Sequence, residues 1–263
     1  MEKKITIIGG GNLGQSIANG LLNNNYKPSS ITITRNKIEL LNDFKARNVT
    51  VLSNNPDAVK EAEVIIIAVK PHSVDKIIKE INPFLDSETI FISVVSGYSL
   101  ENIKDHLNNN VTNIFRAMPN TATEVLESMT CISHTESSSS EATKIVTSIF
   151  DTLGKTTFIS DELMDAATVL GACGIAYALR FIRAMMQGGI EIGFDAKTAN
   201  LIATQTVKGA SELLIKNQNH PEAEIDKVTT PKGCTIAGLN EMENKGFSAA
   251  LIKGIKTSFN KLD

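Results

Sequence analysis

The sequence predicts an α/β fold, in which an N-terminal doubly wound parallel sheet is followed by an all-helical domain. Short β-branched runs alternate with helical stretches over roughly the first 150 residues, as in sheets built from right-handed strand–helix–strand units. After about residue 160 the strand-like runs disappear, and long stretches rich in Ala, Leu, Ile and Met follow. We therefore predict one domain over residues 1–160 and a second over residues 161–263.

Four stretches of the N-terminal part are predicted strands. Ile5–Ile8 comes first and runs into glycines, and Ile31–Thr34 comes second. Residues 64–69 are apolar throughout, as expected for a parallel strand covered on both faces, and residues 91–95 form the fourth strand. A helix is predicted at 37–46, with Ile38, Leu41 and Phe44 spaced to lie on one side. This order of elements supports a sheet with helices on both faces.

The C-terminal part is predicted to be helical throughout. Residues 162–192 are apolar on too many sides for a surface helix. Such a helix either lies at the centre of the helical domain or is buried in a subunit interface, and we favour the interface because about 100 residues offer limited cover. Asp195 is a suitable N-cap for the next helix. Two last helices are expected at 235–244 and 247–260, separated by Gly246.

Composition argues against several classes of partner. The net charge of −3 does not favour a nucleic-acid partner, which requires clustered Lys and Arg. The uncharged stretch 166–179 is shorter than the roughly 20 residues of a membrane span, so we expect a buried helix and no membrane partner. Cys131, Cys173 and Cys234 are far apart, and neither they nor the scattered histidines predict a metal site. With no signal-peptide pattern at the start, we expect a cytoplasmic protein with free thiols.

A glycine motif lies between the first predicted strand and an amphipathic helix. Residues 9–14 fit G-x-G-x-x-G in the strand–helix context that the motif requires. Gly9 allows a tight turn, Gly11 lets the backbone approach a pyrophosphate, and Gly14 permits close packing. A glycine-rich turn without a ligand is the alternative, but the context favours a Rossmann-type dinucleotide site. The predicted phosphate-binding residues are Gly9, Gly11, Asn12, Leu13 and Gly14.

The end of the second strand bears on which dinucleotide binds. NAD sites usually carry Asp or Glu about 20 residues after the glycines, but this strand ends in Thr34, Arg35 and Asn36. Arg35 can pair with a 2′-phosphate or stack on the adenine, and Thr34 and Asn36 can donate hydrogen bonds. These residues favour NADPH and leave NADH possible. A solvated arginine at a strand end is the alternative.

Two further strand ends lie at the edge where ligands bind in such sheets. Val69, Lys70 and Pro71 follow the third strand, and Ser96 and Gly97 follow the fourth. We include Val69, Lys70 and Pro71 among the cofactor-binding candidates. An ordinary surface lysine is the alternative for Lys70.

Several motifs, in order, resemble those of one enzyme family. Residues 116–121 read R-A-M-P-N-T and resemble the R-x-M-P-N-T signature of pyrroline-5-carboxylate reductases. The glycine motif at 9–14 and the V-K-P at 69–71 are similar to that family's phosphate loop and V-K-P. Residues 229–239 resemble its T-S-P-G-G-T-T-x-x-G-L, and residues 243–247 resemble its E-x-G-G-F. The resemblance therefore extends over nearly the whole chain.

The resemblance implies a Rossmann domain followed by a helical dimerisation domain, with homodimers that can assemble into larger rings. It implies hydride transfer from NAD(P)H to the C=N carbon of 1-pyrroline-5-carboxylate, giving L-proline at the end of proline biosynthesis. Asn120 would orient the nicotinamide or ribose, and Thr235 or water would return a proton to the ring nitrogen. The implied substrate-binding residues are Thr229, Thr230, Lys232, Gly233, Cys234 and Thr235.

Elementary chemistry also allows an anion site at residues 229–235. Hydroxyls and successive backbone N–H groups at a helix N-terminus bind anions such as a carboxylate. The alternative is that a threonine merely caps the helix, which requires no ligand.

Two of the resembling motifs depart from the family pattern. Residues 171–177 read G-A-C-G-I-A-Y where the family has S-G-S-G-P-A-Y. Ile175 restores a backbone N–H and favours a more continuous helix, while Cys173 is a poorer hydrogen-bond donor than serine. Lys232 replaces a glycine that tolerates positive φ, although its ammonium can attract a carboxylate.

Three functions are therefore considered. The first is a pyrroline-5-carboxylate reductase that prefers NADPH. The second is a related reductase that acts on another cyclic imine or on a keto acid. The third is a paralogue that binds NADPH without turnover and has a regulatory role, since a fold alone does not define a function.

Overall fold

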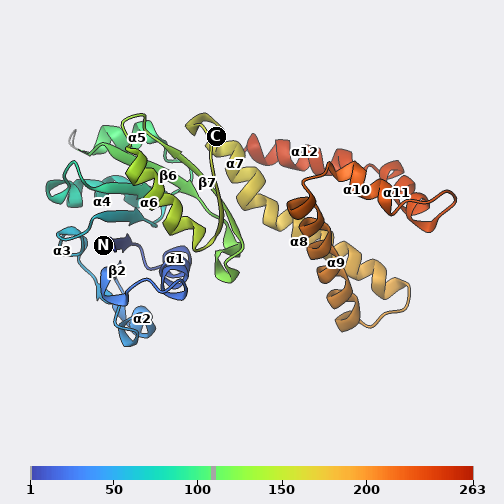
Figure 1. Cartoon of the computed structure of the whole chain (residues 1–263), viewed down its shortest axis with the longest axis horizontal. Helices are drawn as coiled ribbons and strands as arrows, with labels where there is room; N and C mark the ends of the chain where they lie inside the picture. The colour runs from blue at the N-terminus through green and yellow to red at the C-terminus, as the bar shows by residue number, and fades with distance from the viewer. Residues whose placement is uncertain (1, 108–110, 263) are drawn as a thin grey trace. The chain divides into compact units, whose positions relative to one another are not determined.

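The computed structural model describes residues 2–107 and 111–262. Figure 1 shows the chain, which divides into two compact units between Ala172 and Cys173. Residue 161, at which the second domain was predicted to begin, starts a helical run, Asp161–Glu191, and the division between the two units falls within that run. Each unit is described by itself.

The described part of the first unit contains an eight-stranded sheet in the order β3-β2-β1-β4-β5-β6-β7-β8. Strands β1 to β6 are parallel, as expected, but β7 is antiparallel to β6, and β8 is parallel to β7. The sheet is therefore mostly parallel. The strands are β1 (Ile5–Ile8), β2 (Ile31–Thr34), β3 (Thr50–Leu52), β4 (Val64–Ile67), β5 (Ile90–Ser93), β6 (Asn113–Met118), β7 (Ser128–His134) and β8 (Gly154–Phe158).

Helices cover both faces of this sheet, so it is doubly wound as expected. Buried residues of α1, α2 and α6 share one apolar cluster with the strands, and buried residues of α3, α4 and α5 share the other. Both clusters are made of apolar residues, each lying between a sheet face and a layer of helices. The helices are α1 (Asn12–Asn23), α2 (Asn42–Ala46), α3 (Asn55–Val59), α4 (Val74–Ile81), α5 (Leu100–His106) and α6 (Ser140–Asp151).

The helix predicted at 37–46 is divided in the structure. A 3₁₀ turn over Ile38–Leu41 precedes the short helix α2. Leu41 and Phe44 are buried as their spacing suggests, but Ile38 is 43% exposed. The apolar periodicity was therefore correct for two of the three side chains, and the first turn is tighter than an α-helix.

The second unit is all-helical, as expected. Asp195 caps α9 through hydrogen bonds that its carboxylate accepts from the N–H groups of Lys197 and Thr198. Gly246, with φ of +79°, separates the last two helices. The helical run that begins at Asp161 continues through Ile175, which confirms the expected continuous helix at that position. The helices are α7 (Met164–Ala167), a π-helix (Thr168–Cys173), α8 (Gly174–Glu191), α9 (Ala196–Asn217), α10 (Pro221–Lys227), α11 (Cys234–Asn244) and α12 (Phe247–Phe259).

The long apolar helix corrects two expectations. Its run of 31 residues is long and apolar enough to cross a membrane by length and composition alone, whereas the uncharged stretch 166–179 suggested a shorter segment. Only 6% of its most apolar window is buried within the chain, and no residue of α8 is buried. It is thus not the buried central helix of its unit. Leu170 and Leu179 are 69% and 60% exposed, so this apolar surface is available to a partner.

Candidate functional site

The glycine loop between β1 and α1 requires glycine at two positions for reasons of backbone geometry. Gly9 has φ of +112°, and a Cβ there would lie 2.3 Å from the carbonyl oxygen of Ala68. A Cβ on Gly14 would lie 2.1 Å from the carbonyl oxygen of Gly9. These distances match the turn-forming and close-packing roles predicted for Gly9 and Gly14.

Gly11 differs from these two glycines because open space surrounds it. It is the N-cap residue of α1, no side chain caps the helix, and a Cβ at Gly11 would meet no atom within 4 Å. Asn12 is exposed at the first helical position, while Leu13 is half-buried against the core. Helix N-termini of this kind present free N–H groups to phosphate, so the loop fits the pyrophosphate of a dinucleotide.

The end of β2 is hydrogen-bonded to the glycine loop. The Thr34 carbonyl accepts from the N–H groups of Gly9 and Gly10 at 3.3 and 2.7 Å. Arg35 Nη1 donates to the Gly10 carbonyl oxygen at 2.7 Å, which brings the guanidinium beside the loop. A guanidinium carries five N–H donors, so others remain for a phosphate.

The predicted donors on either side of Arg35 differ in their surroundings. Thr34 is buried, and its hydroxyl donates to Asn55 Oδ1 at 2.8 Å, so it supports the loop mainly through its carbonyl. Asn36 is exposed. Asn55, at the start of α3, was not singled out from the sequence because it lies 21 residues from Thr34 with no recognisable motif.

The end of β4 adjoins the same loop. Ala68 N donates to the Ile8 carbonyl at 2.8 Å, and Val69 Cγ1 would lie 2.8 Å from a Cβ on Gly9. Lys70 is exposed and precedes the 3₁₀ turn that begins at Pro71. Val69 therefore flanks the glycine loop, and Lys70 and Pro71 follow it at the carboxyl end of the strand, where ligands of such sheets bind.

Asn120 follows β6 and is 8% exposed. Its Oδ1 accepts from the Ala122 N–H at 3.0 Å, and its Nδ2 donates to the Gly171 carbonyl at 3.1 Å. The side chain thus caps its own 3₁₀ turn and binds the π-helical segment. An amide has a second N–H donor, so a contact with the nicotinamide or ribose stays a prediction.

The predicted substrate loop lies in the second unit. Lys232 has φ of +60°, the left-handed conformation that glycine adopts more easily. Gly233 N donates to the Thr230 carbonyl at 2.9 Å, and a Cβ on Gly233 would lie 2.6 Å from Thr230 Oγ1. A side chain at 233 would therefore require Thr230 to move, and the loop accommodates lysine at 232 at some cost in backbone strain.

The start of α11 favours the anion site over simple capping. Thr229 Oγ1 donates to the Ile225 carbonyl at 2.8 Å, at the end of the preceding helix. No side chain caps α11, whose N-cap residue is Gly233. Cys234 is exposed and Thr235 is half-buried in the first turn. The alternative of N-capping by a threonine is thus wrong, and the first N–H groups of α11 suit a carboxylate.

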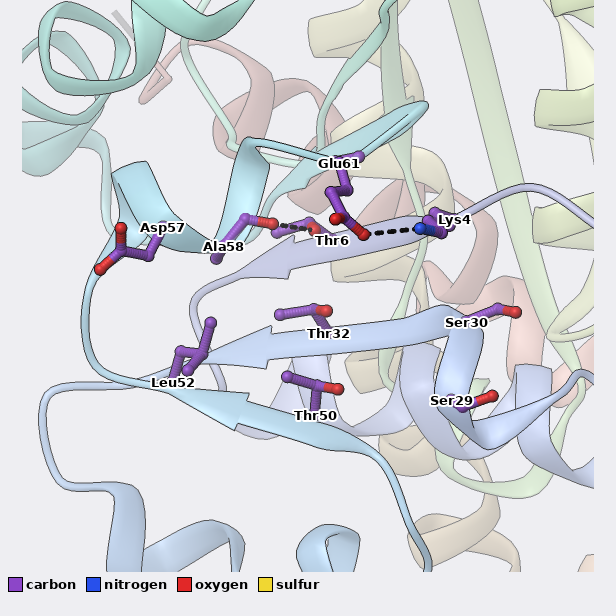
Figure 2. A pocket seen from close by; sticks show the side chains of 11 residues that line it. Lys4, Thr6, Ser29, Ser30, Thr32, Thr50, Leu52, Asp57, Ala58 and Glu61 are labelled. Carbon is purple, nitrogen blue, oxygen red and sulfur yellow. Dashed lines mark hydrogen bonds and ion pairs between the residues drawn. The ribbon is translucent and has the colours of Figure 1, made fainter.

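A separate pocket of about 200 Å³ lies along β1, β2 and β3 (Figure 2). Thr6, Thr32 and Thr50 are paired in register across these strands. Lys4 Nζ lies 2.6 Å from Glu61 Oε2 at its rim. None of the predicted site residues lines this pocket, so it is distinct from the candidate cofactor site.

All three cysteines are free thiols. Burial raises the pKa of the Cys131 thiol, which keeps that side chain protonated. Cys173 ends the π-helical segment, and Cys234 begins α11.

Comparison with protein families gives two matches. Residues 161–263 match a model described as pyrroline-5-carboxylate reductase dimerisation. Residues 4–97 match a model described as NADP oxidoreductase, coenzyme F420-dependent. The two matches fall on the helical part and on the part that contains the glycine loop.

Individual relatives cover the chain from end to end. Pyrroline-5-carboxylate reductase 2 of Dictyostelium discoideum is 43% identical over an alignment that covers 99% of this chain and 92% of that protein. Pyrroline-5-carboxylate reductase 1 of the same organism is 45% identical over 99% of this chain, but the chain spans only 49% of that relative. The enzyme of Glycine max is 32% identical over 94% of this chain and 90% of its own length.

Solved structures show the same similarity. A pyrroline-5-carboxylate reductase from Coxiella burnetii has a TM-score of 0.93 and 28% identity, covering 100% of this chain and 98% of its own. A pyrroline carboxylate reductase from Plasmodium falciparum, with NADP bound, has a TM-score of 0.88 and 25% identity, with the same coverage. At 43% identity to one such reductase over 99% of its own length and 92% of that relative, the chain belongs to the pyrroline-5-carboxylate reductase family.

Proposed function

We propose that the chain uses NAD(P)H to reduce 1-pyrroline-5-carboxylate to L-proline, the final step of proline biosynthesis. The observation that carries this proposal is the 43% identity to a reductase of that name over 99% of this chain and 92% of the relative. The match spans both the glycine loop and the loop at 229–235, the two segments to which we assign the cofactor and the substrate carboxylate.

In the proposed reaction, separate segments of the chain bind the cofactor and the substrate and align the two. Bound NAD(P)H supplies the hydride that adds to the ring carbon of the C=N bond. The glycine loop and the N-terminus of α1 hold the pyrophosphate, and the start of α11 holds the substrate carboxylate. Thr235 or water holds the proton at the ring nitrogen. The imine can arrive protonated, so no general acid is required, and most of the acceleration comes from alignment of the two reactants.

Arg35 supports a preference for NADPH over NADH. Its guanidinium lies beside the glycine loop, and the strand end has no acidic residue at positions 34–36 to bind a ribose 2′-hydroxyl. A guanidinium pairs strongly with a phosphate, which only NADPH carries at that position. NADH remains a usable cofactor because the pyrophosphate site is common to both.

The exposed apolar helix supports a homodimer formed through the helical domain. Leu170, Leu179 and Ile190 are exposed along the run Asp161–Glu191, and this part of the chain matches the dimerisation model. Burial of such a surface against a second copy is favourable. We extend this proposal to a ring of dimers as a higher assembly.

We also propose that the protein is cytoplasmic, with no membrane or nucleic-acid partner. The helix that is long enough to span a membrane would instead pack against the second copy. Fractionation of cells without detergent tests this proposal. Recovery of the protein in the membrane pellet would contradict it.

A direct assay tests the reaction. Purified protein is mixed with NADPH and 1-pyrroline-5-carboxylate while the absorbance of the reduced nicotinamide is followed. We expect its disappearance together with formation of proline. No turnover, with NADPH still raising the melting temperature, would contradict the proposal.

The positive φ of Lys232, in the proposed carboxylate loop, is the observation for which we also consider the two other functions. A reductase of another cyclic imine or of a keto acid would oxidise NADPH with that substrate instead. A paralogue with a regulatory role would bind NADPH and oxidise it with none of these substrates. Activity gained in Lys232→Gly would place the difference in the carboxylate loop.

A further inference from the structure

Arg116 is the first residue of the R-A-M-P-N-T motif, but it has no role in the proposed reaction. It lies in β6 and is 4% exposed. Its Nη1 donates to Asp161 Oδ1 at 2.8 Å, and its Nε has no partner among the described residues. Because a guanidinium is very unfavourable in a core without a counter-charge, Asp161 is what allows Arg116 to lie inside the sheet.

Asp161 joins the start of the long helix to three other elements. Its carboxylate accepts from Arg116 in β6, from Ser133 Oγ in β7 at 2.7 Å, and from the N–H of Leu100 at the start of α5 at 3.1 Å. Ser133 is 1% exposed and the Asp161 side chain is 26% exposed, so this contact is partly buried. The first turn of the run Asp161–Glu191 is therefore held at one point by three donors.

Asn120 provides a second point of attachment to the same run. Its Nδ2 donates to the Gly171 carbonyl at 3.1 Å, within the π-helical segment Thr168–Cys173. Asn120 is itself fixed, because its N–H donates to Ser128 Oγ at 3.0 Å. At about 1.5 Å per residue, Asp161 and Gly171 are roughly 15 Å apart along the helical run. Two residues of one motif thus attach the first part of this run at two points, Asp161 and Gly171.

We propose that Arg116 and Asn120 are positioning residues that hold the helical segment 161–172 at the carboxyl end of β6. Nicotinamide-bearing ligands bind along that edge of such sheets. The segment 161–172 and the backbone at Asn120 would therefore form one side of the nicotinamide-binding site. The proposal rests on the proposed function for its effect on the reaction. The adenine half of the cofactor depends on the glycine loop and Arg35, which these contacts do not touch.

The test compares Asp161→Asn with Glu61→Gln. Both replace the carboxylate of an ion pair in the same unit by an amide, but the Lys4–Glu61 pair is exposed and remote from the motif. In Asp161→Asn we expect hydrogen exchange of amides 164–173 to rise about tenfold while that of α1 is unchanged. We also expect kcat to fall about tenfold, with the dissociation constant for NADPH within about twofold of wild type. Glu61→Gln should leave all three measurements unchanged.

A purely structural role for the cluster would give a different result. Exchange that rises equally in α1 and in segment 164–173, or an unchanged kcat beside faster local exchange, would overturn the proposal. Should Asp161→Asn fail to fold, Ser133→Ala removes one of the three donors and is expected to show a smaller effect in the same segment. If the wild-type protein does not reduce 1-pyrroline-5-carboxylate, the proposed function fails, and the exchange and NADPH measurements still decide the positioning role.

Discussion

Lys232 shows how one residue can carry a cost in the folded state. The left-handed conformation destabilises a non-glycine residue by roughly 1–2 kcal/mol, so replacement by glycine removes that strain. Glycine also has greater freedom in the unfolded chain, which offsets about 0.4–1 kcal/mol of the stabilisation. Lys232 has φ of +60°. We therefore expect Lys232→Gly to increase the free energy of unfolding by about 0.5–1 kcal/mol, measured by urea denaturation.

Lys245 offers the matched control for this prediction. It is also an exposed lysine beside α11, but its φ is −88°. Lys245→Gly gains nothing from relief of strain and is expected to lower the free energy of unfolding. Equal effects of the two substitutions would show that the left-handed backbone at 232 is not the cause.

Arg35 is the residue on which cofactor preference depends. Loss of a charge-assisted contact with a phosphate costs about 1.5–3 kcal/mol, or roughly 10- to 100-fold in affinity. We expect Arg35→Ala to weaken the binding of NADPH by that factor and the binding of NADH by much less, measured by calorimetric titration of both cofactors. Arg47→Ala is the control, because Arg47 hydrogen-bonds to Asn19 instead of the glycine loop. Equal losses for NADPH and NADH in Arg35→Ala would contradict the 2′-phosphate role.

At the scale of an element, different glycines of the turn from β1 into α1 are required for folding and for cofactor binding. A Cβ on Gly14 would collide with the Gly9 carbonyl, whereas a Cβ on Gly11 would meet no protein atom. We expect Gly14→Ala to lower the melting temperature of the free protein. Gly11→Ala should leave it unchanged but abolish the rise that NADPH causes, because the methyl group would occupy the phosphate space.

These two variants control for each other, since each adds the same methyl group to the same loop. The measurement is thermal melting with and without NADPH. A normal NADPH-induced rise in Gly11→Ala would show that the pyrophosphate does not approach Gly11.

At the scale of the whole molecule, the apolar helix accounts for assembly. Leu179 on α8 is 60% exposed, and a glutamate there would place a charge in the proposed dimer interface. We expect Leu179→Glu to convert the dimer into a monomer, measured by light scattering after size exclusion. Leu40→Glu is the control, because Leu40 is similarly exposed, at 53%, but lies in the first unit. A dimer that persists in Leu179→Glu would exclude this part of α8 from the interface.

Local patterns in the sequence were sufficient to predict much of the fold. The apolar strands β1, β2, β4 and β5 were predicted because burial on both faces leaves continuous β-branched runs. Strands β3, β6, β7 and β8 were not, since they are short or mix polar with apolar residues, as in the half-exposed β8. The reversed direction of β7 arises from pairing between distant segments, which no local pattern shows.

The sequence by itself determined the dinucleotide loop, the capping of α9 by Asp195, the glycine between the last helices and the family. The first three depend on residues close together in the chain, whose backbone requirements are visible in their types, and the family depends on several such local motifs in order. Only the tertiary structure decided what Arg116, Asn120 and Thr34 contact. Their partners Asp161, Gly171 and Asn55 lie 45, 51 and 21 residues away, and a hydrogen bond over that separation depends on the folded arrangement of the elements.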